Sequence, residues 1–165
     1  MLKRTTRMAL MVAAGLVVAW LEFLLIPSIG VPGVKLGLAN IATLIALYLM
    51  GVFPAALVCA MRVLLAGFLF GSPASMAYAL CGGLCALAVM ALLKQTGRFS
   101  CVGVSVAGGC AHNGAQLALA ALIARTPGLA YYLPVLLVSG VVTGAITGVV
   151  ARTVLGRIKG RQDGE

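Results

Sequence analysis

Six long apolar runs, separated by short segments of glycine, proline and charge, constrain this chain more than any other feature of its sequence. A run of about 20 apolar residues is long enough to cross the hydrocarbon core of a bilayer as a helix. Of the 165 residues, 62% are hydrophobic and 9% are charged, whereas about a quarter of a soluble chain is charged. We therefore expect an all-α, polytopic membrane protein rather than a water-soluble domain.

The apolar runs predict a single transmembrane domain over residues 1–165, built as a bundle of six transmembrane helices with short connections. The first run is too long for the apolar part of a typical signal peptide, and no small-residue cleavage site follows it, so we interpret it as a retained helix. The tail, 156–165, is polar, and we expect it to fray. The predicted helices cover residues 8–26, 36–50, 53–70, 74–93, 102–124 and 131–155.

The chain is strongly basic, with 12 Lys and Arg against 3 Asp and Glu. If the N-terminus lies inside, most cations fall in inner segments, whereas the outer segments carry only Lys35 and Arg125. Cytoplasmic loops of membrane proteins are enriched in Lys and Arg. We therefore expect an N-in, C-in topology in the bacterial cytoplasmic (inner) membrane. There the cations contact anionic lipid, and we expect no nucleic-acid partner.

The sequence gives no sign of a catalytic, metal or cofactor site. The five cysteines lie in apolar surroundings and are interpreted as small buried residues rather than as a disulfide framework. Cys81 and Cys85 share a helix face, but no second ligand pair accompanies them, so we expect no metal. The chain has one histidine, and its only aspartate is Asp163 in the tail, which excludes a Ser–His–Asp triad. The sequence also lacks a P-loop and clustered carboxylates for Mg²⁺–diphosphate chemistry.

The segment 27–36, PSIGVPGVKL, interrupts the apolar pattern between the first two predicted helices. Its prolines fix φ, and its glycines allow positive φ and close backbone approach. Such a loop beside a membrane is either an ordinary solvated connector or a lid over a cavity. We interpret it as a lid on the outer side.

Three ionisable side chains fall clearly inside the predicted helices: Glu22, Arg62 and His112. A charged group at membrane depth is costly, so we expect each of them to face a cavity or a partner. The simplest arrangement pairs Glu22 with Arg62, or with Lys35 from the lid. Such a pair either has a purely structural role or orders the lid and lines a pocket.

The most polar patch inside any predicted helix is GGCAHNGAQ, 108–116. His112 and Gln116 are four residues apart and share a helix face, and Asn113 lies beside them. A lone histidine in a bundle is usually a hydrogen-bonded packing residue, but three polar side chains together favour a substrate or partner role. The predicted substrate-binding residues are therefore Glu22, Lys35, Asn40, Arg62, His112, Asn113 and Gln116.

Small residues recur every four positions in several predicted helices, and such faces let helix backbones approach closely in lipid. In the last helix Gly140, Gly144 and Gly148 favour internal packing. In the first helix Ala9 and Ala13 suit internal packing and a surface for a partner protein equally well.

The chain resembles a known family over nearly its whole length, from 8 to 155. The resemblance rests on PGVKLGLANI (32–41), RVLL (62–65), GFLFG (67–71), SVAGGCAHNGAQ (105–116) and YYLPVLLVSGVVTG (131–144). The family is the bacterial membrane family described both as Gx transporter and as heptaprenyl diphosphate synthase component I. It is similar in turn to the substrate-binding S-components of energy-coupling-factor vitamin transporters, six-helix proteins whose first outer loop closes over a pocket.

The resemblance implies two alternative functions. The first is a substrate-binding transport subunit for a small isoprenoid- or cofactor-related molecule. Such a subunit would work with a coupling transmembrane subunit and ATPases and dock on them through small residues of the first helix, which Ala9 and Ala13 match. The second is a non-catalytic accessory subunit for prenyl diphosphate or quinone synthesis or flavin-based electron transfer, with a prenyl synthase or a redox protein as partner. Because the Asp-rich motifs of prenyl synthases are missing, we do not expect the chain itself to be an enzyme.

Overall fold

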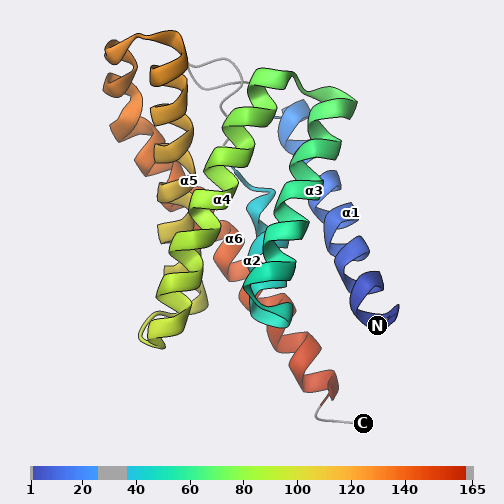
Figure 1. The fold of residues 1–165 in the computed structure, drawn as a ribbon. Coiled ribbons are helices and arrows are strands. Elements are labelled where there is room, and N and C mark those ends of the chain that lie inside the picture. The colour runs from blue at the N-terminus through green and yellow to red at the C-terminus, as the bar shows by residue number, and fades with distance from the viewer. Residues whose placement is uncertain (1, 26–36, 163–165) are drawn as a thin grey trace.

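The computed structural model describes residues 2–25 and 37–162, and every structural statement below concerns that part of the chain. These residues form six α-helices and one short 3-10 helix, without strands (Figure 1). Five of the α-helices are long and apolar enough to cross a membrane. The prediction of an all-α membrane bundle is therefore confirmed. The elements are α1 (Leu2–Leu25), α2 (Asn40–Met50), α3 (Val52–Phe70), α4 (Pro73–Thr96), α5 (Cys101–Ala124), η1 (Pro127–Tyr132) and α6 (Leu133–Gln162).

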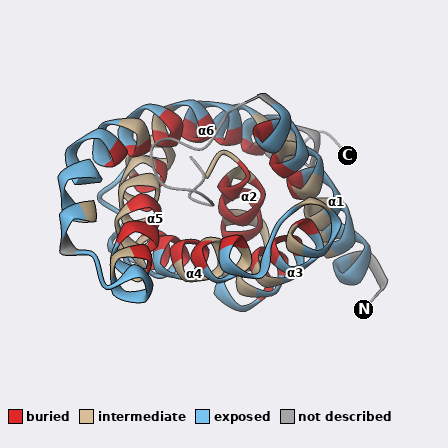
Figure 2. Cartoon of the chain, turned by 90° about the horizontal axis from the view of Figure 1, so that it is seen from above, coloured by how far each residue is buried: buried red, intermediate tan, exposed pale blue. Residues whose placement is uncertain are grey.

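The short helix α2 lies inside a ring formed by the other five α-helices (Figure 2). Its 11 residues span about 16 Å, which is well short of the roughly 30 Å hydrocarbon core. Most of its side chains are buried, among them Leu44 and Leu47. It packs against α1, α3, α4 and α6. The centre of the bundle is therefore built around a helix whose described length is shorter than the hydrocarbon core.

Local sequence signals set the ends of the long helices. Pro73 occupies the first turn of α4, where a missing N–H costs nothing, and Ser72 and Ser75 form a capping box in front of it. Ser100 accepts a hydrogen bond from the Gly103 N–H and caps α5. These caps satisfy donors that the helices themselves leave open.

Two boundaries of the structure differ from the expected ones. The second helix begins at Asn40 and not near residue 36, because Gly37 has a φ of +82° and the backbone turns there before α2. At the other end of the chain α6 continues to Gln162, through a stretch that has no proline to interrupt it. Fraying of the tail stays a prediction.

The glycine face of α6 packs internally against α5. A Cβ atom on Gly140 would lie 2.9 Å from the carbonyl carbon of Gly109, and one on Gly144 would lie 2.7 Å from the Cα of Val106. Backbones this close leave no room for a side chain. The predicted internal role of the glycines agrees with this contact.

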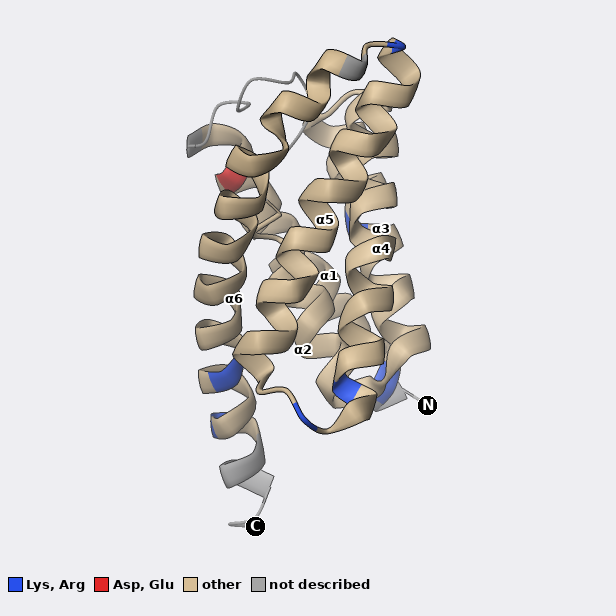
Figure 3. Ribbon diagram, turned by 90° about the vertical axis from the view of Figure 1, so that its left-hand side faces the viewer, with Lys and Arg blue, Asp and Glu red and all other residues tan. Residues whose placement is uncertain are grey.

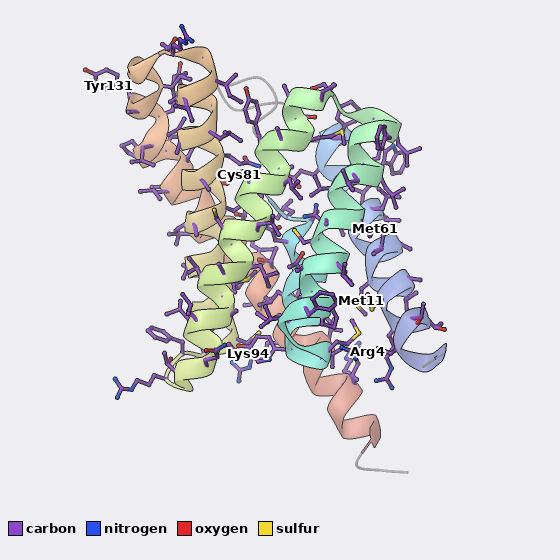
Figure 4. All side chains as sticks on the ribbon, in the orientation of Figure 1. Arg4, Met11, Met61, Cys81, Lys94 and Tyr131 are labelled. Carbon is purple, nitrogen blue, oxygen red and sulfur yellow. The ribbon has the colours of Figure 1, made fainter. Side chains whose placement is uncertain are left out.

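The cations lie mainly at one end of the bundle. The N-terminal end of α1, the α4–α5 connection and the C-terminal part of α6 share that end, whereas Arg125, which follows α5, lies at the other (Figure 3). Figure 4 shows Arg4 and Lys94 at the basic end and Tyr131 at the opposite end. This asymmetry is the one that an N-in, C-in topology requires, and the topology itself stays a prediction.

Lys94 also fixes the C-terminal end of α2. Its ammonium donates a hydrogen bond of 2.7 Å to the carbonyl oxygen of Leu47 and lies 4.9 Å from the centre of the Tyr48 ring. A cation is favourable at the C-terminal end of a helix, where carbonyl groups lack partners. The central helix is thus held from α4.

Candidate functional site

The candidate site is centred on the backbone of Gly37, in the turn that precedes α2. The Gly37 N–H donates a hydrogen bond of 2.8 Å to Oε1 of Glu22, which projects from α1 and is 5% exposed. A Cβ atom on Gly37 would lie 2.8 Å from Cδ2 of His112 on α5. Only glycine therefore fits here, both because of its positive φ and because the imidazole lies against its backbone.

Arg62 lies on another side of the same centre, on α3, and is 6% exposed. Its Nη2 donates to Oδ1 of Asn40, the first residue of α2, over 3.3 Å, and its Nε has no hydrogen-bond partner. The aliphatic stem of Arg62 packs against Gly15 of α1, where a Cβ atom would lie 2.7 Å from Cδ. The missing side chain at Gly15 is what admits an arginine to the interior.

His112 and Gln116 close the centre from α5. Their Nε2 atoms lie 2.8 Å apart, and both residues are almost fully buried. Because an amide nitrogen can only donate, the imidazole accepts at Nε2. Both side chains lie against Gly82 of α4, where a Cβ atom would lie 2.7 Å from Cγ of Gln116.

These side chains enclose a cavity of about 20 Å³, which is room for about one water molecule. Most of the other wall residues are small, and Met76 is the long flexible exception. The lining residues are Ala19, Glu22, Gly37, Arg62, Val63, Ala66, Gly67, Ser75, Met76, Ala79, His112 and Gln116.

The predicted pairing of Glu22 with Arg62 does not occur. Both side chains line the cavity, but among the described residues Glu22 contacts a backbone N–H and Arg62 contacts an amide oxygen. An acid and a base therefore face the same small space, and Nε of the arginine has no hydrogen-bond partner. Such a site can hold a small polar molecule by complementary charges and hydrogen bonds.

The other predicted site residues lie elsewhere or outside the described residues. Asn113 faces α6, where its Nδ2 donates to the Leu136 carbonyl over 2.7 Å and to Ser139 Oγ over 3.0 Å. It joins two helices and does not line the cavity. Lys35 and the predicted lid, 27–36, lie outside the part of the chain that the structure describes.

Several cavity residues were not among the predicted site residues, and Gly37, Ser75 and Met76 are three of them. Gly37 carried a usable signal, because the sequence already suggests that the glycines of this segment allow positive φ and close backbone approach. Nothing in the sequence distinguishes Met76 from the other apolar residues of its helix. Its position becomes apparent only from its packing over Gly67, where a Cβ atom would overlap it.

A second hollow lies on the outer surface, between α1 and α3. It is an apolar groove of about 420 Å³ that contains both Ala9 and Ala13. The two alanines are exposed on the surface of the bundle, whereas Gly15 and Ala19 of the same helix are buried. The groove is lined by Thr5, Met8, Ala9, Val12, Ala13, Leu16, Leu57, Val58, Met61 and Leu65.

A family model described as heptaprenyl diphosphate synthase component I matches residues 11–154, which is most of the chain. The match includes the residues that we call the polar centre, which are Glu22, Gly37, Arg62, His112 and Gln116. No curated protein and no solved structure matches.

Proposed function

The chain belongs to the heptaprenyl diphosphate synthase component I family, and from this premise we propose that it is a substrate-binding membrane subunit. It binds a small polar or polar-headed molecule at the centre formed by Glu22, Gly37, Arg62, His112 and Gln116, and it passes that molecule across the membrane together with an energising partner. The fold positions this centre by gathering residues from α1, α3 and α5 around the start of α2.

The observation that carries the proposal is the burial of an uncompensated arginine. Arg62 is 6% exposed, and its Nε has no partner in the described structure. Buried polar groups are normally hydrogen-bonded, and ionisable groups at membrane depth usually serve a site or a pathway. An arginine that only stabilised the bundle would be expected to use its donors fully. Arg62 instead lines the cavity and has one donor without a partner, which supports a role for its guanidinium in binding an anionic or acceptor group of a substrate.

The groove between α1 and α3 supports the second half of the proposal. Ala9 and Ala13 leave a shallow, apolar depression that a helix of a coupling subunit can enter closely. The basic end of the bundle faces the cytoplasm in this proposal, so ATPases would act on the complex from that side. We place the protein in the bacterial cytoplasmic membrane on the same grounds.

The family description favours a second candidate, a membrane accessory subunit of a prenyl diphosphate synthase. The chain would then hold a catalytic partner at the membrane through the same groove. In that case the polar centre has a structural role only, and its residues can be exchanged without loss of function as long as the bundle folds.

Native mass spectrometry of the detergent-purified protein separates the two candidates. We expect a stoichiometric small molecule on the wild type, absent from Arg62→Met and present on Thr147→Val. Thr147 is the matched control because it is buried, bonded to Ser105, and outside the cavity. If both variants match the wild type in carrying no small molecule while the wild type copurifies with a prenyl synthase, the binding proposal is wrong and the accessory role is supported.

A further inference from the structure

Glu22 and Arg62 are an acid and a base that are both buried and line one cavity, yet each has a different partner. In the described structure no hydrogen bond or ion pair joins them. Two opposite charges in a low-dielectric interior attract strongly and would pair if the fold brought their charged groups together. The fold instead holds them apart with separate partners, Gly37 for the carboxylate and Asn40 for the guanidinium.

Each of the two groups retains capacity for further hydrogen bonds. A guanidinium has five N–H donors, and Arg62 uses Nη2 on Asn40 while its Nε has no partner. A carboxylate has about four acceptor sites, and Glu22 receives the Gly37 N–H at Oε1. That N–H belongs to the turn that precedes α2, so Glu22 accepts a backbone donor near the N-terminal end of that helix. The cavity therefore presents a cationic donor and an anionic acceptor at the same time.

The charge of a ligand decides whether it suits this pair. A simple anion bound at Arg62 would be repelled by Glu22, and a simple cation bound at Glu22 would be repelled by Arg62. A molecule with both charges satisfies both groups and adds no net charge to the membrane interior.

Building on the function proposed above, we propose that the ligand of the polar centre is a small zwitterion. Its anionic group binds Arg62 and its ammonium binds Glu22, while His112 and Gln116 limit its orientation from α5. The cavity measures about 20 Å³ in this conformation, so such a ligand enters only when the wall moves. Met76 is the wall residue best suited to move, because its unbranched thioether chain adopts many rotamers and its neighbours Gly67 and Ala79 are small.

Thermal stabilisation of the detergent-purified protein by matched probes tests the proposal. The zwitterions are glycine, β-alanine and γ-aminobutyrate, which have increasing separations between their charges, and the single-charge controls are propionate and propylamine. We expect at least one zwitterion to bind the wild type at least tenfold more tightly than either control. If propionate alone, or propionate and propylamine added together, bound as tightly as the best zwitterion, the zwitterion proposal would be wrong. The proposal of a small-molecule site would still stand.

Charge-removing variants supply the second arm. In Glu22→Gln the preference should move from the zwitterion to propionate, and in Arg62→Gln it should move to propylamine. Arg62→Lys, which keeps the charge, should retain the zwitterion preference, and the neutral double variant Glu22→Gln/Arg62→Gln covers the case in which a single variant does not fold. The Thr147→Val control should behave as the wild type. If the ligand preferences stay unchanged in the variants, the charges of Glu22 and Arg62 do not determine which ligand binds, and the zwitterion proposal is wrong. If native mass spectrometry finds a ligand that is not a zwitterion, the zwitterion fails while the binding function stands.

Discussion

Replacing Gly37 with alanine tests the centre of the candidate site directly. Gly37 has a φ of +82°, and a left-handed conformation costs an L-residue about 1–2 kcal/mol. The new Cβ would also lie 2.8 Å from Cδ2 of His112 and 3.2 Å from Nδ2 of Asn40. Overpacking of this kind costs about 1–3 kcal/mol. We therefore expect a loss of about 3 kcal/mol in the free energy of unfolding, which lowers Tm by about 6–12 °C in a chain of this size.

The matched control is Gly97→Ala. Gly97 also has a positive φ, of +67°, but no atom lies within 4 Å of its Cβ position. Its substitution measures the backbone cost alone, which we expect to be about 1–2 kcal/mol. Size-exclusion chromatography of heated, detergent-solubilised protein gives Tm for both variants.

The double variant Gly37→Ala/His112→Ala isolates the contact between the two residues. Because the second substitution removes the imidazole that the new methyl group meets, the pair should be less destabilising than the sum of the two single variants. The reasoning would be refuted if Gly37→Ala cost no more than Gly97→Ala, or if the two substitutions at the centre were simply additive.

Four further outcomes follow from the structure. Gly140→Ala should destabilise the bundle by about 1–3 kcal/mol because its methyl group meets the α5 backbone, whereas Gly156→Ala, with no atom within 4 Å, should leave Tm nearly unchanged. Lys94→Met should cost about 1–3 kcal/mol, because the Leu47 carbonyl at the end of α2 loses a charged donor, and heating the variant in detergent checks this. Ala13→Leu should fill the α1–α3 groove and abolish copurification of a partner without lowering Tm, because the residue is exposed; a partner that still copurifies would place its binding surface elsewhere. A fluorescent protein fused to the C-terminus should fold and fluoresce in cells if that end is cytoplasmic, and a dark fusion with normal membrane expression would contradict the N-in, C-in topology.

The structure changed the interpretation of the most polar patch. His112, Asn113 and Gln116 are close in sequence, and spacing alone allows all three to face one site. Asn113 instead follows the α5–α6 contact, where it bonds Leu136 and Ser139, because consecutive helix residues point about 100° apart. Which face of α5 meets α4 and which meets α6 depends on the glycines of the neighbouring helices, and no local pattern in α5 encodes it.

The hydrogen-bond partner of Glu22 likewise could not be predicted from the sequence. A sequence with one buried acid and one buried base suggests an ion pair, but the carboxylate binds the Gly37 backbone. The position of that N–H depends on how the chain enters α2, and backbone donors are invisible in a side-chain inventory. The short length of α2 has a related cause, since the apolar run that predicts a longer helix includes the turn at 37–39.

By itself, the sequence determined that the chain is a bundle of membrane helices and that Glu22, Arg62 and His112 mark its interior. The reason is that bilayer thickness and the cost of burying charge act on the chain locally and can be read from run lengths and residue types. Only the tertiary structure decided that these side chains lie around Gly37, and that Asn113 bonds to α6 instead of lining the cavity. It also decided that Ala9 and Ala13 line an exposed groove. Those outcomes depend on which helix faces meet, and close contacts between glycines and side chains far apart in the sequence decide this.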